Sequence, residues 1–250
     1  MAKTLQDTRI QLQRGEVTSE RLVAEALASA TSAEGQGDKV FIKVYEEQAM
    51  DQAKAIDQVR KSGVELHPLC GIPISIKDLF DVAGEITLSG SIVRKKSVPA
   101  SSDAHIVTKL RAAGAILIGR TNMTEFAFSG LGINPHYGTP LNPWDRKTGR
   151  IPGGSSSGAA ISVTDNMAAA AIGTDTGGSV RIPSALCGLT GFKPTAARVS
   201  KEGAFPLSTT LDSIGPLANS VSCCSLLDQT MRGAAVNVLF DKPVDGLTLA

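Results

Sequence analysis

The sequence predicts an α/β fold: a mixed, mostly buried central sheet flanked by helices on both faces. Three observations lead to this prediction. From about residue 61 onward, short apolar runs of strand length alternate with helical patterns, and such alternation is typical of helices packed on a sheet. Apolar residues make up 42% of the 250 residues, which is enough to bury a core. The sequence also contains no internal repeat, so a repeat architecture is not expected.

The N-terminal segment, residues 1–60, is expected to be helical and to pack on a core formed by residues 61–250. Thr18 precedes an apolar pattern of helical period over residues 22–27, and threonine is a favourable residue at a helix N-cap. A second helix is expected over residues 48–61, because Ser62 and Gly63 end its pattern.

The core is expected to alternate strands and helices, with a Pro- and Gly-rich surface loop at residues 134–150. Strands are expected where short apolar runs lie between turn residues, and helices where the apolar period is longer. In chain order, the expected elements are a strand at 71–76, a helix at 104–113, a strand at 115–118, a short helix at 122–129, a helix beginning near 157, a strand at 167–172, a helix at 219–231, and strands at 236–239 and from 244 onward.

The composition argues against several classes of protein. Lys and Arg number 25 against 24 Asp and Glu, with no basic stripe, so direct binding to nucleic acid is not expected. The apolar runs are far shorter than the roughly 20 residues that cross a membrane, so no membrane association is expected. The N-terminus also lacks the apolar segment of a secretory signal, which favours a cytoplasmic location.

The cysteines and histidines show no metal-binding spacing. The four cysteines form no C-x-x-C pair and the three histidines are scattered. These patterns lack the usual zinc spacings, and we expect neither a metal nor an organic cofactor. The thiols are expected to be free and buried, as most such cysteines are.

Two serines framed by glycines and one lysine carry the chemical signal. Ser155 lies in the segment GGSSSG and Ser179 in GTDTGGS, while Lys77 ends the apolar run that begins at residue 71. A serine needs a base to act as a nucleophile at neutral pH. A lysine can accept a proton when it is neutral, and burial favours its neutral form. These three residues could therefore supply nucleophilic chemistry without histidine.

Other serine or glycine motifs fit less well. A phosphate-binding Walker loop requires Gly-Lys followed by Ser or Thr, which is absent here. Residues 154–158 match G-x-S-x-G, but that motif must follow a strand, and residues 146–152 are polar and end in proline. Nothing around His67, His105 or His136 is typical of a Ser-His-Asp triad.

The lysine and serine segments together resemble the amidase signature family, whose members use a Ser-Ser-Lys triad. The similarity covers the lysine segment, GGSSSG and the whole of residues 173–195 (GTDTGGSVRIPSALCGLTGFKPT), and it continues more weakly from about residue 40 to the end. The resemblance implies that Ser179 is the nucleophile that forms an acyl-enzyme. It implies that Ser155, 24 residues earlier and in a cis peptide, relays protons, and that Lys77 is the base.

Further site residues are expected around the nucleophile. The backbone N–H groups of Thr176, Gly177, Gly178 and Ser179 are expected to converge on the oxygen that becomes negative in the tetrahedral intermediate. Asp78 is expected to point away from Lys77 or to pair with another cation, because a close carboxylate would oppose a neutral lysine. The residues expected to support the site or to contact substrate are Ser156, Asp175, Arg181, Asn122, Met123 and Gly130.

Asp175 and Arg181 flank the nucleophile and have two interpretations. An ion pair between them would hold the loop without taking part in chemistry. Alternatively, Arg181 contacts an anionic part of the substrate.

The function that the resemblance implies is hydrolysis of a small carboxylic amide to a carboxylate plus ammonia or an amine, with a homodimer as a possible assembly. An alternative is the glutamine-hydrolysing A subunit of an aminoacyl-tRNA amidotransferase. Residues 196–199, Ala-Ala-Arg-Val, depart from the aromatic residue and glycine that many relatives carry there, which weakens that alternative. Because family members are longer, we expect this chain to be part of a longer fold. An inactive interaction domain is then a third hypothesis.

Overall fold

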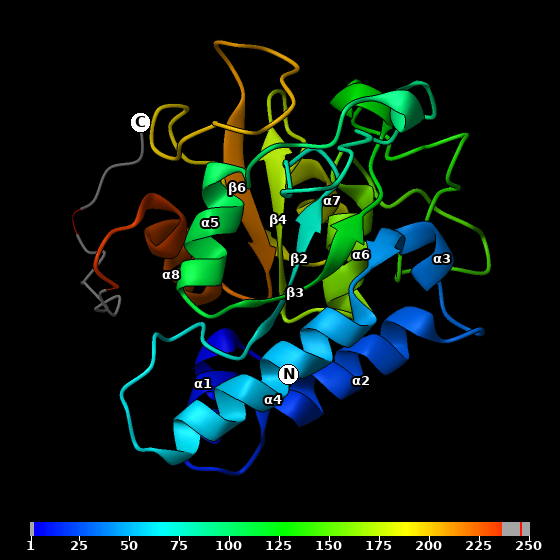
Figure 1. The fold of residues 1–250 in the computed structure, drawn as a ribbon. Coiled ribbons are helices and arrows are strands. Elements are labelled where there is room, and N and C mark those ends of the chain that lie inside the picture. Colours follow the sequence, from blue (N-terminus) through cyan, green and yellow to red (C-terminus); the bar gives the residue numbers. More distant parts are fainter. Residues whose placement is uncertain (1–2, 237–245, 247–250) are drawn as a thin grey trace.

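The computed structural model describes residues 3–236 and 246, and it contains a mixed six-stranded sheet (Figure 1). The strand order is β1-β3-β2-β4-β6-β5, with β2, β3 and β4 parallel and the remaining strands antiparallel to their neighbours. The strands are β1 (Phe41–Val44), β2 (Pro73–Lys77), β3 (Ile116–Thr121), β4 (Ala170–Asp175), β5 (Thr190–Gly191) and β6 (Ser213–Ala218). The predicted α/β class with a mixed sheet is confirmed.

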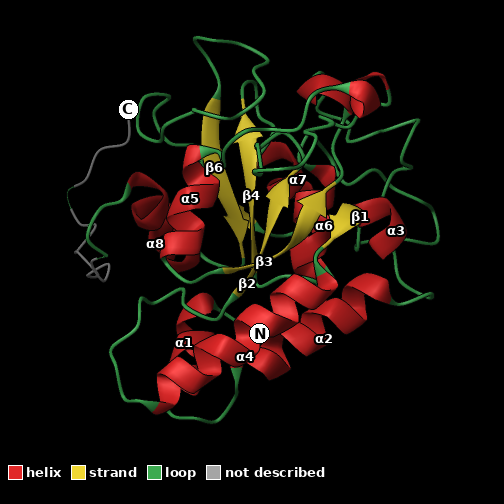
Figure 2. Cartoon of the chain, in the orientation of Figure 1, coloured by secondary structure: helices red, strands yellow, loops and turns green. Residues whose placement is uncertain are grey.

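Helices cover both faces of this sheet, as predicted. Figure 2 shows α5 and α8 on one side of the sheet and α6 and α7 on the other. The helices are α1 (Leu5–Gln13), α2 (Ser19–Thr31), α3 (Gly37–Val40), α4 (Glu46–Lys61), α5 (His105–Ala112), α6 (Ser157–Thr164), α7 (Arg181–Leu186) and α8 (Val221–Arg232), with short 3-10 turns η1 (Val93–Lys96) and η2 (Glu125–Ala127).

The two faces of the sheet bury two separate apolar cores. Along β4, Ala170 and Ile172 belong to the core beneath α5 and α8, whereas Ala171 belongs to the core beneath α6. Successive side chains of a strand point to opposite faces, so a strand buried on both faces is apolar at successive positions. This explains why β2, β3 and β4 were recognisable as short apolar runs.

The N-terminal helices begin and end largely as predicted. The Thr18 hydroxyl accepts a hydrogen bond from the N–H of Arg21 and caps α2, and α4 ends at Lys61 before Ser62. The expectation that the first 60 residues are helical is wrong for Phe41–Val44. These residues form β1 because they pair with the edge of β3, where Phe41 lies opposite Thr121. A domain boundary near residue 60 stays a prediction.

The predicted strand at 167–172 is shifted to Ala170–Asp175. The chain first turns after α6, where Asn166 has a φ of 56° and the N–H of Met167 donates to the carbonyl of Ser162. The predicted strands at 71–76 and 115–118 correspond to β2 and β3, and the helices predicted at 104–113, near 157 and at 219–231 correspond to α5, α6 and α8.

The short helix predicted at 122–129 is wrong. Only the turn η2 forms there, because Phe126 and Ala127 have φ values of 51° and 59°, which a right-handed helix excludes. The prediction also missed β6, since Gly215 and Pro216 are unfavourable in an interior strand. The strands predicted at 236–239 and from 244 onward lie outside the described residues, apart from Val236 and Gly246.

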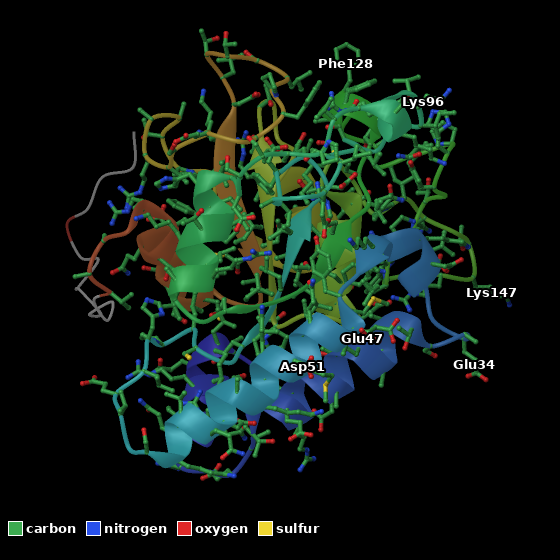
Figure 3. All side chains as sticks on the ribbon, viewed as in Figure 1. Glu34, Glu47, Asp51, Lys96, Phe128 and Lys147 are labelled. Carbon is green, nitrogen blue, oxygen red and sulfur yellow. The ribbon has the colours of Figure 1, made fainter. Side chains whose placement is uncertain are left out.

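The parallel arrangement determines where functional residues gather. The carboxyl ends of β2, β3 and β4 lie at one edge of the sheet, marked by the arrowheads in Figure 1. Figure 3 shows Phe128 at this end of the molecule and Glu47 and Asp51, on α4, at the opposite end. In open α/β sheets this edge is the usual location of ligand sites. None of the helices within the described residues has the length and apolar character needed to cross a bilayer.

Candidate active site

Lys77, the last residue of β2, joins two distant segments of the chain at this edge. Its side chain is 0% exposed. The Nζ atom donates hydrogen bonds to the hydroxyl of Ser155 at 2.7 Å and to the hydroxyl of Thr174 at 2.9 Å. The lysine is therefore fixed beside a serine 78 residues away in the sequence.

Burial changes the charge state of this lysine. Removal from water lowers the pKa of Lys77 to about 7, although the negative charges of Asp175 and Asp212 act in the opposite direction. An unburied lysine stays protonated until well above neutral pH. At neutral pH a large fraction of Lys77 is thus unprotonated and able to accept a proton.

Asp78 follows Lys77 directly but faces another cation, as the sequence predicts. Its carboxylate accepts a hydrogen bond from the guanidinium of Arg120 at 2.7 Å, and the two side chains are 0% and 2% exposed. Arg120 also donates to the carbonyl of Phe80 and pairs with Glu85. The negative charge of Asp78 is thereby compensated inside this cluster instead of by Lys77.

Ser155 lies in a tightly packed turn before α6. The peptide bond between Gly154 and Ser155 is cis, as the family resemblance implies. The N–H of Gly154 donates to the carbonyl of Gly130, and the carbonyl of Ser155 accepts from the N–H of Thr124. A Cβ atom on Gly154 would lie 2.5 Å from the backbone nitrogen of Gly132, so no larger residue fits without movement.

Ser179 lies in the loop between β4 and α7, beside the Ser155 segment. Its carbonyl accepts a hydrogen bond from the N–H of Ser156 at 3.3 Å, which ties the two serine segments together. The residue is 7% exposed, and within the described residues its hydroxyl makes no hydrogen bond. Gly178 has a φ of 131°, a conformation that requires glycine. Ser179 is therefore held by its backbone while its hydroxyl stays available.

The backbone N–H groups around Ser179 differ in whether they have an acceptor within the protein. The N–H of Gly178 donates to the carboxylate of Asp175 at 2.8 Å. This N–H group is therefore already bonded within the protein, contrary to the expectation that it faces the substrate oxygen. In the described part of the chain, the N–H groups of Gly177 and Ser179 donate to no protein acceptor.

Asp175 organises the loop that carries Ser179. Its buried carboxylate accepts from the N–H groups of Gly178, Val180 and Arg181 and forms a bidentate pair with the Arg181 guanidinium at 2.9 and 3.0 Å. Burial raises the pKa of Asp175, but the hydrogen bonds from Arg181 and from these N–H groups outweigh it and hold the pKa below its ordinary value. The ion pair considered from the sequence is present, and Asp175 stays charged.

The remaining predicted residues support these segments. The Ser156 hydroxyl lies 3.4 Å from the carbonyl of Thr174. Asn122 donates from its side-chain amide to the carbonyls of Lys39 and Gly138, so that amide is used within the protein. Met123 is fully buried and its carbonyl accepts from the amide of Asn134. Asn122 and Met123 thus hold loops together.

The structure adds two residues that the sequence did not single out. Thr174 contacts Lys77 Nζ, and Asp212 accepts a hydrogen bond from the Thr176 hydroxyl at 2.5 Å. The position of Thr174 near the end of a strand was a usable signal, since the strand ends at one edge of the sheet. Asp212 lies 33 residues beyond Ser179 in a segment without a motif, so nothing in the sequence marked it.

A cavity of about 170 Å³ is lined by Thr174, the second hydroxyl partner of Lys77, whereas Lys77, Ser155 and Ser179 do not line it. Its lining also includes Thr176, next to β4, and Phe205, Pro206 and Leu207 from the segment before β6. Pockets for small molecules are mostly apolar with a few polar groups, and this cavity has that character. No group of three or more His, Cys, Asp or Glu side chains suited to a metal ion occurs among the described residues.

The structure places a buried lysine–serine pair at the carboxyl end of a mixed α/β sheet, and comparison with known proteins identifies the family. The sequence model of the Amidase family matches residues 21–243. The chain therefore belongs to the Amidase family, which confirms the resemblance recognised from its motifs.

Individual relatives span more than one activity. The chain is 41% identical over 219 residues to the AtzE subunit of 1-carboxybiuret hydrolase from Pseudomonas sp. strain ADP, covering 88% of this chain and 47% of the relative. It is 43% identical over 231 residues to the A subunit of glutamyl-tRNA(Gln) amidotransferase from Roseiflexus sp. strain RS-1, covering 92% and 46%. The chain thus spans about half the length of these relatives.

Solved structures agree with the fold. The peptide amidase of Stenotrophomonas maltophilia superposes with a TM-score of 0.82 at 33% identity, over 94% of this chain and 48% of that protein.

Proposed function

We propose that the protein is an amidase that cleaves a carboxylic amide through an acyl-enzyme on Ser179. The observation that carries this proposal is the buried hydrogen bond from Lys77 Nζ to Ser155 Oγ at 2.7 Å, next to the Ser179 backbone that Ser156 holds. Membership of the Amidase family supports it. A base, a relay hydroxyl and a nucleophile are the groups that amide cleavage without histidine needs.

The proposed reaction begins with proton transfer. Neutral Lys77 accepts the proton of the Ser155 hydroxyl while Ser155 accepts that of Ser179. The Ser179 oxygen bonds to the amide carbon, and the carbonyl oxygen becomes negative. The N–H groups of Gly177 and Ser179 are the donors we assign to that oxygen, and one such donor contributes on the order of 3 kcal/mol to lowering the barrier.

Collapse of the intermediate then breaks the C–N bond. The proton held by Lys77 returns through Ser155 to the leaving nitrogen, which departs as ammonia or an amine. Water, deprotonated by the same relay, hydrolyses the ester and releases the carboxylate and Ser179. Lys77 and Ser155 return to their starting states at the end of acylation and again at the end of deacylation, so the reaction consumes only amide and water.

Covalent labelling tests this proposal without knowledge of the substrate. A serine-reactive fluorophosphonate is added to the purified protein, and the modified peptide is identified by mass spectrometry. We expect the adduct on Ser179, lost in Ser179→Ala and slowed in Lys77→Met by at least about 10³-fold, because triad residues act as a unit. A folded protein without an adduct on Ser179 contradicts the proposal and favours an interaction domain.

The comparisons favour a second candidate function, that of the A subunit of a glutamyl-tRNA(Gln) amidotransferase. The 43% identity to such a protein is the supporting observation. Both candidates use the same acyl-enzyme chemistry, and they differ in dependence on other proteins of a complex. Ammonia release from glutamine that appears only when those partner proteins are added supports the second candidate. Hydrolysis of simple amides by the protein alone supports the first.

A further inference from the structure

We propose that Asp212 is a positioning residue of the candidate active site, whose carboxylate fixes residues 176–179 against the loop of residues 206–212 through the Thr176 hydroxyl. This inference rests on the proposed function. It assigns no contact between Asp212 and the substrate, since Asp212 acts through the segment that carries the oxyanion donors.

The antiparallel pairing of β4 with β6 places Asp212 beside Thr176. Ser213 lies opposite Asp175 in the ladder, so the residues just outside it, Asp212 and Thr176, are neighbours. The Thr176 hydroxyl donates to Asp212 Oδ1 at 2.5 Å, and the Ser213 hydroxyl donates to the Asp175 carbonyl at 2.8 Å. Asp212 is 9% exposed, so water competes little for its carboxylate.

The same carboxylate also holds the cavity wall. It accepts from the N–H of Leu207 at 2.9 Å and from the N–H of Ser208 at 3.0 Å. The N–H of Asp212 donates to the Ser208 carbonyl in return. Leu207, Ser208 and Thr176 all line the cavity beside the lysine–serine cluster. One carboxylate therefore links residues of two chain segments that line that cavity.

Two carboxylates hold the nucleophile segment, one on each side of Gly177. Asp212 holds Thr176 through its hydroxyl, and Asp175 holds Gly178 through its N–H. Gly177 itself has open space around the position of a Cβ atom, so side-chain packing does not fix it. The direction of the Gly177 N–H, which we assign to the oxyanion, consequently depends on these two attachments.

Asp212 also acts on Lys77 through its charge. The charged groups that act on Lys77 are Asp175 and Asp212, and both favour its protonated form. Asp175 is paired with Arg181, whereas Asp212 has no ion-pair partner among the described residues. Removal of the Asp212 charge should therefore lower the pH at which Lys77 becomes neutral, in addition to loosening the segment.

The test compares Asp212→Asn with Thr176→Val by the rate of fluorophosphonate labelling of Ser179 across a pH series. Asp212→Asn should lower the labelling rate at the high-pH plateau by about tenfold or more, because an oxyanion donor is no longer aligned. It should also move the midpoint of the rate–pH curve to lower pH. Thr176→Val keeps the Asp212 charge, so it should lower the plateau and leave the midpoint unchanged. Asp145→Asn, on the surface loop, is the control and should match the wild type.

If both variants show the wild-type plateau rate of labelling and the wild-type midpoint pH, the positioning role of Asp212 is overturned. If Asp212→Asn fails to fold, Thr176→Val still tests the inference, because it keeps the hydrogen bonds from the N–H groups of Leu207 and Ser208 to Asp212. An equal plateau in folded Thr176→Val and wild type then contradicts the inference. A wild-type protein that is not labelled on Ser179 overturns the proposed function itself, which separates the two failures.

Discussion

Lys77 Nζ and Ser155 Oγ lie 2.7 Å apart, and both side chains are fully buried. The amine has a second hydroxyl partner in Thr174 at 2.9 Å, while the neighbouring carboxylate of Asp78 is bound to Arg120. The lysine is thus surrounded by hydroxyl groups instead of a paired carboxylate. Burial without direct ion pairing favours a neutral amine, so the charge of Lys77 changes near neutral pH.

Labelling of Ser179 should depend on pH through this lysine. Burial lowers the pKa of Lys77 to about 7. Below that pH the amine is protonated and cannot accept a proton, whereas above it the amine is neutral and active. The labelling rate should rise with pH, with a midpoint near 7, and then level off. A rate that keeps rising to pH 10 would show that Lys77 keeps its ordinary pKa.

Protein stability should depend on pH through the same group. The pKa of Lys77 is about 7 in the folded state and 10.5 when unperturbed. Between these values the unfolded chain binds a proton that the folded protein does not, so stability rises with pH by up to about 1.4 kcal/mol per unit. Below pH 7 this contribution is constant.

The comparison with Lys77→Met isolates that effect, because methionine does not titrate. Urea unfolding at about pH 7 and pH 9 should show the wild type gaining stability relative to the variant as pH rises. An unchanged difference between the two proteins would contradict the perturbed pKa. Other titrating groups cancel in the difference, since both proteins contain them.

Asp78→Ala should strongly destabilise the fold. The substitution leaves Arg120 buried without its 2.7 Å partner, and loss of one member of a buried ion pair costs about 3–5 kcal/mol. Urea unfolding measures the change. Glu25→Ala is the matched control, because Glu25 pairs with Arg21 on the exposed surface, where such a pair contributes about 0.3–0.5 kcal/mol. Equal effects of the two substitutions would refute the role assigned to the buried pair.

Gly177→Ala should separate activity from stability. A Cβ atom at Gly177 meets no atom within 4 Å, so folding should be unaffected within about 0.5 kcal/mol. The added methyl group lies two residues before Ser179, and we expect it to slow labelling. In Gly173→Ala, by contrast, the Cβ atom would lie 2.6 Å from the Ser156 hydroxyl. That variant should lose stability, whereas normal labelling by a stable Gly177→Ala protein would contradict the expectation that a methyl group at residue 177 obstructs the site.

The sequence allowed prediction of the central sheet because β2, β3 and β4 are buried on both faces. Continuous apolar runs follow from that burial, so these strands could be recognised without tertiary information. The edge strand β1 and the antiparallel strand β6 could not be recognised from the sequence in this way. β1 depends on pairing with β3, and β6 contains Gly215 and Pro216, whose local preferences oppose a strand. Tertiary pairing outweighed local propensity in both cases.

By itself, the sequence determined the family and the residue types of the candidate site, because glycine-framed serines and a lysine after an apolar run are local patterns. Only the tertiary structure decided which groups face each other. It directed Asp78 toward Arg120, committed the Gly178 N–H to Asp175 and brought Asp212 to Thr176. Strand register and burial determine these contacts, and both arise from pairing between segments that are far apart in the chain.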